Sequence, residues 1–325
     1  MLARNRNCNN KPNGVQKQNA PKGDLRGKNA PAYLEADTML GKGESFRVEK
    51  MIAGGGFGQI YRAFNVDTDE EVAVKVERAL THDSQRMILE SKVLDEMLGT
   101  KHFPIVYYIG PLKSYNYIVM QMLGRNLGDI RRALPMKKMS IRSAIRIGIQ
   151  IVEALSSLHG KGWLHRDLKP TNCCLGVEEK RKQVYLVDFG MSRRFRNDDG
   201  SNREKRTYCG FRGTTRYCSY RMHDRREQGP VDDLWCLYYT LGELIEGYLP
   251  WREMESADEM AQAKKILKHD VIFPSMPSKF ASFDRNLRRL GQSDTPHYAK
   301  FQNILGSCVK YVDDNAEFEW DLMGI

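Results

Sequence analysis

The sequence predicts an α+β fold in which a small antiparallel sheet precedes a larger, mainly helical part. Three observations carry this prediction. Short runs with strand-like alternation occupy residues 46–76, an amphipathic helical pattern follows at 84–98, and a segment that is apolar nearly all round a helix follows at 145–158. With 41% hydrophobic residues, the chain of 325 residues can build a core, which excludes a globally disordered protein.

The first 32 residues differ in composition from the rest of the chain. They contain seven lysines and arginines against one aspartate and have few apolar residues. We therefore expect a disordered basic arm, which we extend to residue 45. A solvated tail is the simpler interpretation, and contact with an anionic partner is the alternative. The arm lacks interleaved aromatic residues, which disfavours a nucleic-acid partner.

Neither a membrane segment nor a disulfide framework is indicated. No run approaches the roughly 18 uncharged apolar residues of a membrane span, and the first residues lack the apolar run of a signal peptide. The seven cysteines include no CxxC pair, so we expect reduced thiols. We expect a monomer in the cytoplasm or nucleus without a membrane partner. Because Trp320 lies near the end of the sequence, we also expect no long C-terminal extension that could inhibit or target the protein.

The first two predicted strands flank a glycine cluster. Phe46, Val48 and Ile52 alternate on one face of the first strand, and the second strand begins near Ile60. Glycines let backbone N–H groups approach phosphates closely, although such a turn alone also fits a plain hairpin. Since a strand follows the cluster where a dinucleotide-binding fold would have a helix, the sequence disfavours that fold. The cluster comprises Gly54, Gly55, Gly56, Phe57 and Gly58.

The third predicted strand, residues 72–76, carries a lysine on the same face as a small residue. The period of two places Ala73 and Lys75 on one face and three valines on the other. In the helix at 84–98, Glu90 lies in the middle of the apolar stripe. A buried carboxylate requires a partner, so we expect Glu90 to pair with Lys75. An exposed glutamate at the edge of the stripe is the alternative.

Two short acidic motifs follow the buried helix. The first is His165-Arg166-Asp167-Leu168-Lys169-Pro170-Thr171-Asn172, and the second is Asp188-Phe189-Gly190, with a predicted strand at 184–187 between them. Their occurrence downstream of a glycine-rich loop and a strand lysine has a low probability of being coincidental.

From about Phe46 to its end, the chain resembles a eukaryotic protein kinase. The resemblance implies a bilobal kinase fold with a catalytic domain at 46–325, a small lobe at 46–122 and a large lobe at 123–325. It also implies a serine/threonine protein kinase that uses ATP and Mg²⁺ to phosphorylate proteins. A catalytically silent kinase-fold scaffold is the alternative.

The resemblance assigns a role to each motif residue. Lys75, oriented by Glu90, would bind the α and β phosphates of ATP. Asp167 would accept the proton of the substrate hydroxyl, and Lys169 would steady the transferred phosphate. The magnesium ligands would be Asn172 and Asp188.

The same resemblance implies an adenine pocket. Ala73 and Ile60 would form its roof, Met120 its back and Cys174 its floor, where we expect an inert packed thiol. Ala53 stands where the family has the first glycine of the phosphate loop, and its Cβ could lower nucleotide affinity. The predicted nucleotide-binding residues are Ile52, Ala53, Gly54, Gly55, Gly56, Phe57, Gly58, Ile60, Ala73, Lys75, Met120, Gln121, Met122, Leu123 and Cys174.

Other segments resemble the casein kinase 1 group, and within it the tau-tubulin kinase branch. Ser219-Tyr220-Arg221 replaces the usual Ala-Pro-Glu, so the carboxylate that ties this segment to the large lobe is missing. Thr214 would brace the catalytic aspartate, and Asp233 would hold the catalytic loop. The segments most like the branch are Gly210-Phe211-Arg212-Gly213-Thr214-Thr215-Arg216-Tyr217, Asp232-Asp233-Leu234-Trp235, Leu249-Pro250-Trp251 and Glu317-Phe318-Glu319-Trp320.

The segment from Asp188 to Arg221 is strongly basic, with nine lysines and arginines against four acidic residues. We expect it to select acidic or already phosphorylated protein substrates, with Arg212 and Arg216 as the best phosphate ligands. A solvated loop is the alternative. Arg166 could also bind a phosphate on the loop itself, although relatives of this group usually do not need one.

Overall fold

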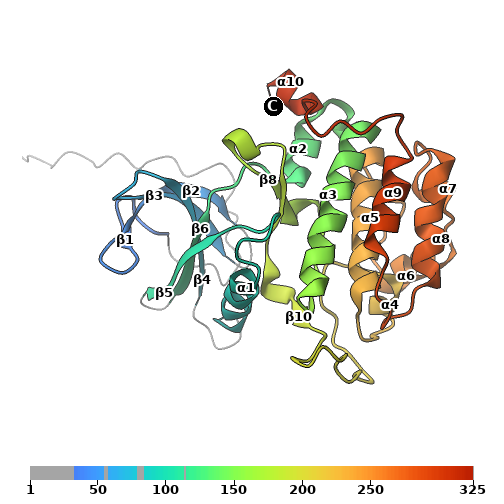
Figure 1. Cartoon of the computed structure of the whole chain (residues 1–325), viewed down its shortest axis with the longest axis horizontal. Coiled ribbons are helices and arrows are strands. Elements are labelled where there is room, and N and C mark those ends of the chain that lie inside the picture. Colours follow the sequence, from blue (N-terminus) through green and yellow to red (C-terminus); the bar gives the residue numbers. More distant parts are fainter. Residues whose placement is uncertain (1–32, 55–57, 79–83, 113–114, 325) are drawn as a thin grey trace, which may run out of the picture.

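The computed structural model describes residues 33–54, 58–78, 84–112 and 115–324. It has two lobes, with a sheet at one end of the molecule and a bundle of helices at the other (Figure 1). This arrangement confirms the predicted α+β fold. Residues 1–32 of the predicted arm and the predicted site residues Gly55, Gly56 and Phe57 lie outside the described residues.

The small lobe is built on a six-stranded antiparallel sheet with the strand order β1-β2-β3-β4-β6-β5. Helix α1 (Ser84–Glu96) connects β4 to β5 and faces the large lobe (Figure 1). The strands are β1 (Met39–Leu40), β2 (Phe46–Gly54), β3 (Gln59–Asn65), β4 (Glu71–Arg78), β5 (Val106–Leu112) and β6 (Tyr115–Gln121).

The predicted end of the arm at residue 45 is wrong, because residues 33–45 belong to the small lobe. Strand β1 pairs with β2, and Leu40 is buried in the core of the sheet. The N–H of Leu34 donates to the hydroxyl of Tyr61, and the N–H of Gly41 donates to that of Tyr117. The stretch of low apolar content on which the predicted disorder depends ends before Leu34. The predicted arm should not have been extended to residue 45, because Leu34 and Leu40 connect this stretch to the sheet.

The predicted alternation that places Ile52 on the same face of β2 as Phe46 and Val48 is also wrong. Register shifts between Val48 and Lys50 and between Met51 and Ala53 interrupt the alternation of the strand. Each shift changes which residues face the core. Met51 therefore packs against the core, and Ile52 is 47% exposed.

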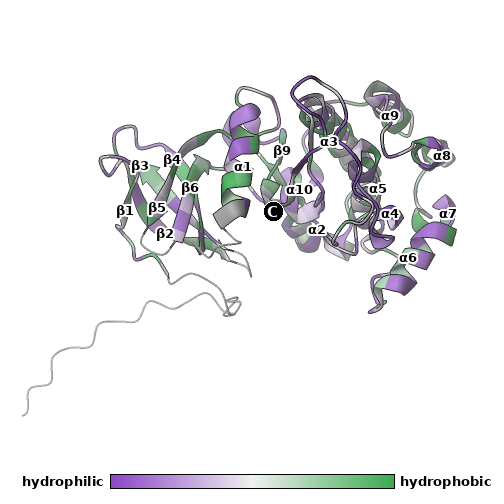
Figure 2. Cartoon of the chain, turned by 90° about the horizontal axis from the view of Figure 1, so that it is seen from below, coloured by the Kyte–Doolittle hydropathy of each residue, from purple (hydrophilic) through white to green (hydrophobic). Residues whose placement is uncertain are grey.

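The two faces of β4 have the predicted composition. Its three valines lie in the core of the sheet, and Ala73 lies in a second buried cluster on the opposite face. The predicted helix at 84–98 ends at Glu96, and Glu90 is buried on it. Figure 2 shows both hydrophilic and hydrophobic residues on α1, as expected for a helix that covers a core with one face.

Two buried helices, α3 and α5, form the centre of the large lobe. All residues of α5 are buried, and the apolar residues predicted at 145–158 are buried on α3. None of the helices in the described part of the chain is long and apolar enough to span a membrane. The helices are α2 (Leu127–Ala133), α3 (Ile141–Gly160), α4 (Tyr220–His223), α5 (Pro230–Glu246), α6 (Ala257–Ile266), α7 (His269–Ile272), α8 (Ala281–Arg289), α9 (Tyr298–Gly306) and α10 (Glu319–Met323).

Four short strands carry the loops between α3 and α4. Strand β7 pairs with β10, and β8 pairs with β9, both antiparallel. The β8–β9 hairpin separates the two acidic motifs, as the sequence predicts. These strands are β7 (Trp163–Leu164), β8 (Cys173–Leu175), β9 (Val184–Leu186) and β10 (Arg193–Arg194).

Candidate active site

The lysine of β4 and the glutamate of α1 form the predicted ion pair. Lys75 Nζ lies 2.5 Å from Glu90 Oε2, and both side chains are largely buried. Asp188 Oδ1 lies 3.5 Å from the same ammonium. Although burial alone would lower it, the carboxylates of Glu90, Asp188 and Glu77 hold the pKa of Lys75 well above its usual value. The ammonium is therefore charged at neutral pH.

Glu77 is a third carboxylate at this lysine, and the sequence analysis missed it. Its Oε1 lies 3.2 Å from Lys75 Nζ, and burial raises the pKa of Glu77 above its usual value. The signal was present, because a period of two along β4 places Glu77 on the same face as Ala73 and Lys75.

Three side chains donate hydrogen bonds to Asp167, two of them from its own loop. Thr214 Oγ1 donates to Asp167 Oδ1 at 2.7 Å, and Lys169 Nζ donates to Oδ2 at 2.7 Å. Lys169 also donates to Thr214 Oγ1 at 3.1 Å. The amide of Asn172 donates to the backbone carbonyl of Asp167 at 2.9 Å. The hydrogen bond expected of a bracing Thr214 is thus present.

Asp233 on α5 binds the backbone of the loop that carries Asp167, as predicted. Its carboxylate accepts the N–H groups of His165 and Arg166, both at 2.8 Å, and contacts His159 Nε2 at 2.9 Å. Although burial opposes it, these hydrogen bonds keep the pKa of Asp233 below its usual value. A buried, ionised carboxylate therefore fixes the backbone that carries Asp167.

Asn172 and Asp188 suit a magnesium ion. Asn172 Nδ2 lies 3.5 Å from Asp188 Oδ2 and also donates to the carbonyl of Asp167, and within the described residues no hydrogen bond to the amide oxygen of Asn172 is found. Asp188 has a left-handed backbone with φ +65°, which is uncommon for a residue other than glycine. Although burial opposes it, the cation of Lys75 lowers the pKa of Asp188. Carboxylate and amide oxygens are the ligands that Mg²⁺ prefers, with phosphates completing its shell.

Four of the residues predicted to line an adenine pocket lie close together. Ala73 lies opposite Met120 in the β4–β6 ladder, and both belong to a buried cluster that includes Met122 and against which Ile60 packs. No backbone hydrogen bond to the N–H of Leu123 occurs among the described residues, so this donor is available to a planar base.

Cys174 lies outside that cluster, on β8, where it bridges to Asn126. Burial raises the pKa of the Cys174 thiol to about 12, which agrees with the predicted inert side chain.

The two ends of the phosphate loop differ in their need for glycine. A Cβ at Gly58 would lie 2.8 Å from the carbonyl oxygen of Val76, so this position must be glycine for β3 and β4 to approach. Ala53 continues β2, pairs with Ile60 and has no positive φ. The structure therefore shows no backbone strain at Ala53.

Residues 46–311 match the protein kinase domain family, which covers most of the chain. This chain belongs to the protein kinase family. The match agrees with the geometry above, in which a strand lysine, a helix glutamate and two loop aspartates surround one site.

The curated relatives of this kinase include serine/threonine kinases. A probable serine/threonine-protein kinase of Dictyostelium discoideum is 35% identical over 85% of the chain and 56% of its own length. A Caenorhabditis elegans protein named putative casein kinase I is 38% identical over 73% of the chain and 72% of its own length. The C. elegans serine/threonine-protein kinase spe-6 is 32% identical over 80% of the chain and 70% of its own length. The chain thus spans just over half the length of the Dictyostelium relative.

The basic segment after Asp188 is partly neutralised by residues outside it, which changes the charge predicted from the sequence. Glu227 pairs with Arg193 at 3.1 Å and with Arg206 at 2.7 Å, and Glu96 on α1 pairs with Arg194 at 3.0 Å. Sequence reasoning missed Glu227 and Glu96, because nothing in their local sequence indicates these partners. Fewer of the segment's cations are therefore free for a substrate than its composition implies.

Arg166 lies close to the arginines that Glu227 binds. Its Nε donates to the carbonyl of Met191 at 2.6 Å. Burial, together with repulsion from Arg193 and Arg206, lowers the pKa of Arg166 to about 10. Glu227 thus supplies negative charge where the sequence suggested a loop phosphate.

Proposed function

We propose that this protein is a serine/threonine protein kinase that transfers the γ-phosphate of ATP to protein hydroxyls and prefers acidic or already phosphorylated substrates. The observation that carries the proposal is the Asp167 carboxylate, which Lys169 and Thr214 orient on a loop that Asp233 holds. Phosphoryl transfer depends mainly on such positioning and on neutralising phosphate charge.

Each residue has a defined part in the proposed reaction. Asp167 orients the substrate hydroxyl and accepts its proton as the phosphate is transferred. Lys169, which already contacts Asp167, neutralises charge on the transferred group. Lys75 holds the phosphates of the nucleotide, and Glu90 fixes its position. Asn172 and Asp188 would hold Mg²⁺, which would supply further neutralisation of the phosphate charge.

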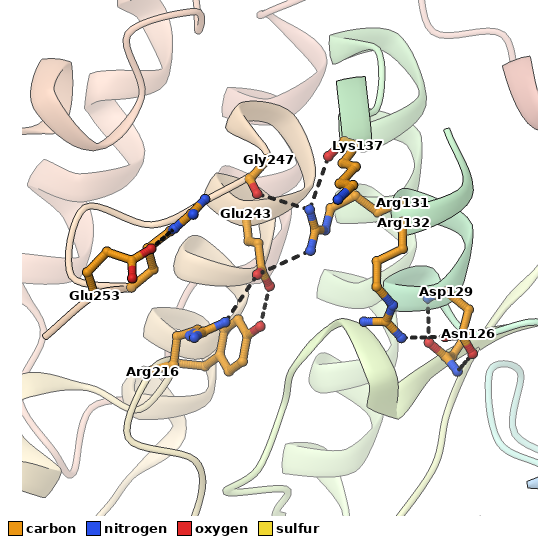
Figure 3. A network of polar contacts seen from close by, with 11 residues as sticks. Asn126, Asp129, Arg131, Arg132, Lys137, Arg216, Glu243, Gly247 and Glu253 are labelled. Carbon is orange, nitrogen blue, oxygen red and sulfur yellow. Dashed lines mark hydrogen bonds and ion pairs between the residues drawn. The ribbon is translucent and has the colours of Figure 1, made fainter. Parts of the chain in front are cut away.

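Arg216 is the cation best placed to bind an anionic substrate group. Arg216 lies 3.6 Å from Glu243, which also receives Arg131 and the hydroxyl of Tyr217 (Figure 3). One carboxylate is thus shared by two guanidinium groups, and the side chain of Arg216 is 43% exposed. The guanidinium of Arg216 can therefore donate to a substrate phosphate while Arg131 still pairs with Glu243.

Arg212 is a second candidate for this role. It is exposed, and the only hydrogen bond found for it in the described part of the chain goes to the carbonyl of its neighbour Phe211, at 3.0 Å. Both arginines lie within a few residues of Thr214, which contacts the catalytic aspartate.

The preference is tested with two peptides that differ only in a phosphoserine near the target serine. We expect a higher kcat/KM for the phosphorylated peptide than for the unphosphorylated one. Arg216→Gln should lower the kcat/KM of the phosphorylated peptide about tenfold, because it removes a charge-assisted hydrogen bond. Arg252→Gln is the matched control, since Arg252 is exposed and pairs with its neighbour Glu253. Equal kcat/KM for the two peptides with the wild type would contradict the preference.

The second candidate function is a catalytically silent scaffold, for which Ala53 is the sequence support. The ordinary strand backbone of Ala53 and the assembled Lys75–Glu90 pair favour the active enzyme. Binding of Mg·ATP without any transfer to casein or to peptides would support the scaffold.

We also propose that the protein belongs to the casein kinase 1 group and to its tau-tubulin kinase branch. The relative named as a casein kinase I supports the group. Support for the branch comes from the resemblance of the segments around Thr214, Asp233 and Trp251.

A further inference from the structure

The segment that would bind substrate lacks the carboxylate that usually anchors it. Ser219-Tyr220-Arg221 stands at that position, yet Cys218 and Ser219 are fully buried. Ser219 donates to Asp232, and Arg221 donates to the carbonyl of Leu290, so the end of the segment is held in another way. These contacts do not reach the residues next to Thr214.

A buried lysine from the large lobe reaches those residues. Lys264 on α6 is 0% exposed, and its Nζ donates to the carbonyls of Thr215 at 2.5 Å and of Cys218 at 2.7 Å. The third neighbour of the ammonium is His223 Nε2 at 3.2 Å. Within the described residues, no carboxylate lies at ion-pairing distance from Lys264. The two carbonyls and His223 thus serve as acceptors for the three protons of the ammonium, and the sulfur of Cys218 lies further away at 3.9 Å.

Aromatic rings complete the surroundings of this cation. Lys264 Nζ lies 5.2 Å from the ring centre of Tyr239 and 5.3 Å from that of Trp251. Cation–π contacts of this kind stabilise a desolvated ammonium. Trp251 in addition donates its indole N–H to the carbonyl of Arg216 at 2.9 Å. Lys264 and Trp251 therefore hold three carbonyls of one short stretch, at residues 215, 216 and 218.

We propose that Lys264 is a positioning residue that replaces the missing carboxylate anchor, holding the carbonyls of Thr215 and Cys218 so that Thr214 stays on Asp167. The usual anchor is a carboxylate of the segment itself, whereas here the charged group belongs to the large lobe. The cation comes from the large lobe and the acceptors are backbone carbonyls of the segment, so no acidic residue is required at positions 219–221. Because Thr214 is the residue before Thr215, loss of the anchor displaces a donor that contacts the catalytic carboxylate.

The anchor depends on the charge of Lys264. Burial lowers the pKa of Lys264 to about 8. The other titratable groups that face it are Cys218, with a pKa raised to about 11, His223, with a pKa lowered to about 4, and the thiol of Cys236 and hydroxyl of Tyr239, whose pKa values are raised well above normal. Of this group, only Lys264 changes charge between about pH 7 and 9.5. As the pH rises through 8, Lys264 loses its charge, one of its three hydrogen-bond donors and its cation–π contacts.

This inference rests on the kinase activity proposed above and not on the preference for acidic substrates. The test compares Lys264→Met with Lys265→Met, the neighbouring lysine that is partly exposed and pairs with Asp224. For both an acidic and a neutral peptide, we expect Lys264→Met to lower kcat/KM about 10- to 100-fold with the KM for ATP unchanged, because misplacement of the substrate segment affects transfer and not nucleotide binding. Lys265→Met should behave as the wild type. A wild type that does not distinguish the two peptides contradicts only the substrate preference.

The thermal unfolding temperature separates positioning from general damage. Methionine removes a desolvated charge, which favours folding, but leaves the carbonyls of Thr215 and Cys218 without their donor, which opposes it, so we expect only a small change in this temperature for Lys264→Met. Wild-type kcat/KM in Lys264→Met, or an equal rise of the KM for ATP, would overturn the proposal.

If the variant does not fold, the pH profile of the wild type decides. Peptide kcat/KM that declines above about pH 8, at constant KM for ATP, would support the anchor. A flat profile between about pH 7 and 9.5 would overturn it.

Discussion

Two buried lysines organise this kinase, and their surroundings are opposite. Lys75 in the small lobe lies among the carboxylates of Glu90, Glu77 and Asp188, which raise its pKa well above normal. Lys264 in the large lobe lies among carbonyls and aromatic rings, and burial lowers its pKa to about 8. The same side chain is thus a permanent charge at one site and a titratable charge at the other.

The difference follows from what each lysine must hold. Lys75 is placed to meet phosphates, so its charge has to persist when an anionic ligand binds and leaves, and fixed carboxylates ensure this. Lys264 holds neutral carbonyls of its own chain, for which hydrogen bonds suffice. Removing the charge should therefore destabilise the small lobe much more than the large lobe.

The largest effect is expected for Lys75→Met. It leaves Glu90 and Glu77 buried without their cation, so we expect the free energy of unfolding to fall by about 3 kcal/mol. Turnover should fall about 10²- to 10³-fold, because a preorganised donor to the phosphates is lost. Denaturant unfolding and steady-state kinetics measure the two effects. Unchanged stability would mean that the carboxylates of the small lobe do not depend on Lys75.

The pH dependence of stability gives the next largest effect. The folded-state pKa of Lys264, about 8, lies below the unfolded value of 10.5, so the unfolded chain binds more protons between these pH values. Stability of the wild type relative to Lys264→Met should therefore rise with pH across that window, by about 1.4 kcal/mol per unit. Chemical denaturation of both proteins at several pH values tests the sign. A difference that falls with pH would contradict the lowered pKa.

Glu227→Gln tests the ion-paired part of the same segment. Although burial alone would raise it, Arg206 and Arg193 lower the pKa of Glu227 to about 2. We expect the variant to lose about 2 kcal/mol at neutral pH. Because the folded pKa is depressed, this contribution is present above about pH 4.5 and is lost as the pH falls towards 2.

Thermal unfolding of Glu227→Gln at neutral and acidic pH measures this contribution, with the exposed Glu204→Gln as control. If both variants unfold as the wild type does, Glu227 does not stabilise the segment.

The smallest effect is expected for Glu77→Gln. Lys75 keeps its closest partner Glu90, which lies at 2.5 Å in the wild type, so the KM for ATP should rise only about two- to threefold. Glu90→Gln removes the closest partner and should lower kcat about tenfold or more. Steady-state kinetics with varied ATP compare the two variants. Equal losses would show that the three carboxylates act as one unit.

Much of the small lobe's site could be predicted from the sequence, because its chemistry lies in short motifs. Lys75 and Glu90 stand out as a charge on a strand face and a charge in an apolar stripe, and burial leaves such groups few partners. Ile52 was misplaced because two bulges in β2 interrupt the alternation, and no residue pattern marks them.

The anchor in the large lobe could not be predicted, because it depends on tertiary proximity. Lys264 lies 46 residues from Cys218 in the chain and is followed by a second lysine, Lys265, so its pattern is that of an exposed charged helix face. Glu227 likewise lies outside the segment whose charge was counted. Only the packing of α6 against α4 shows which of the two lysines is buried.

The central claim is that Asp167 serves as the base of an active serine/threonine kinase. The most direct test is transfer of labelled phosphate from Mg·ATP to dephosphorylated casein and to an acidic serine peptide, comparing the wild type with Asp167→Asn. We expect transfer by the wild type and a decrease of about 10²- to 10⁴-fold in the variant, because the positioned base is lost. Equal transfer by the two proteins, or ATP binding without transfer by the wild type, would contradict the claim.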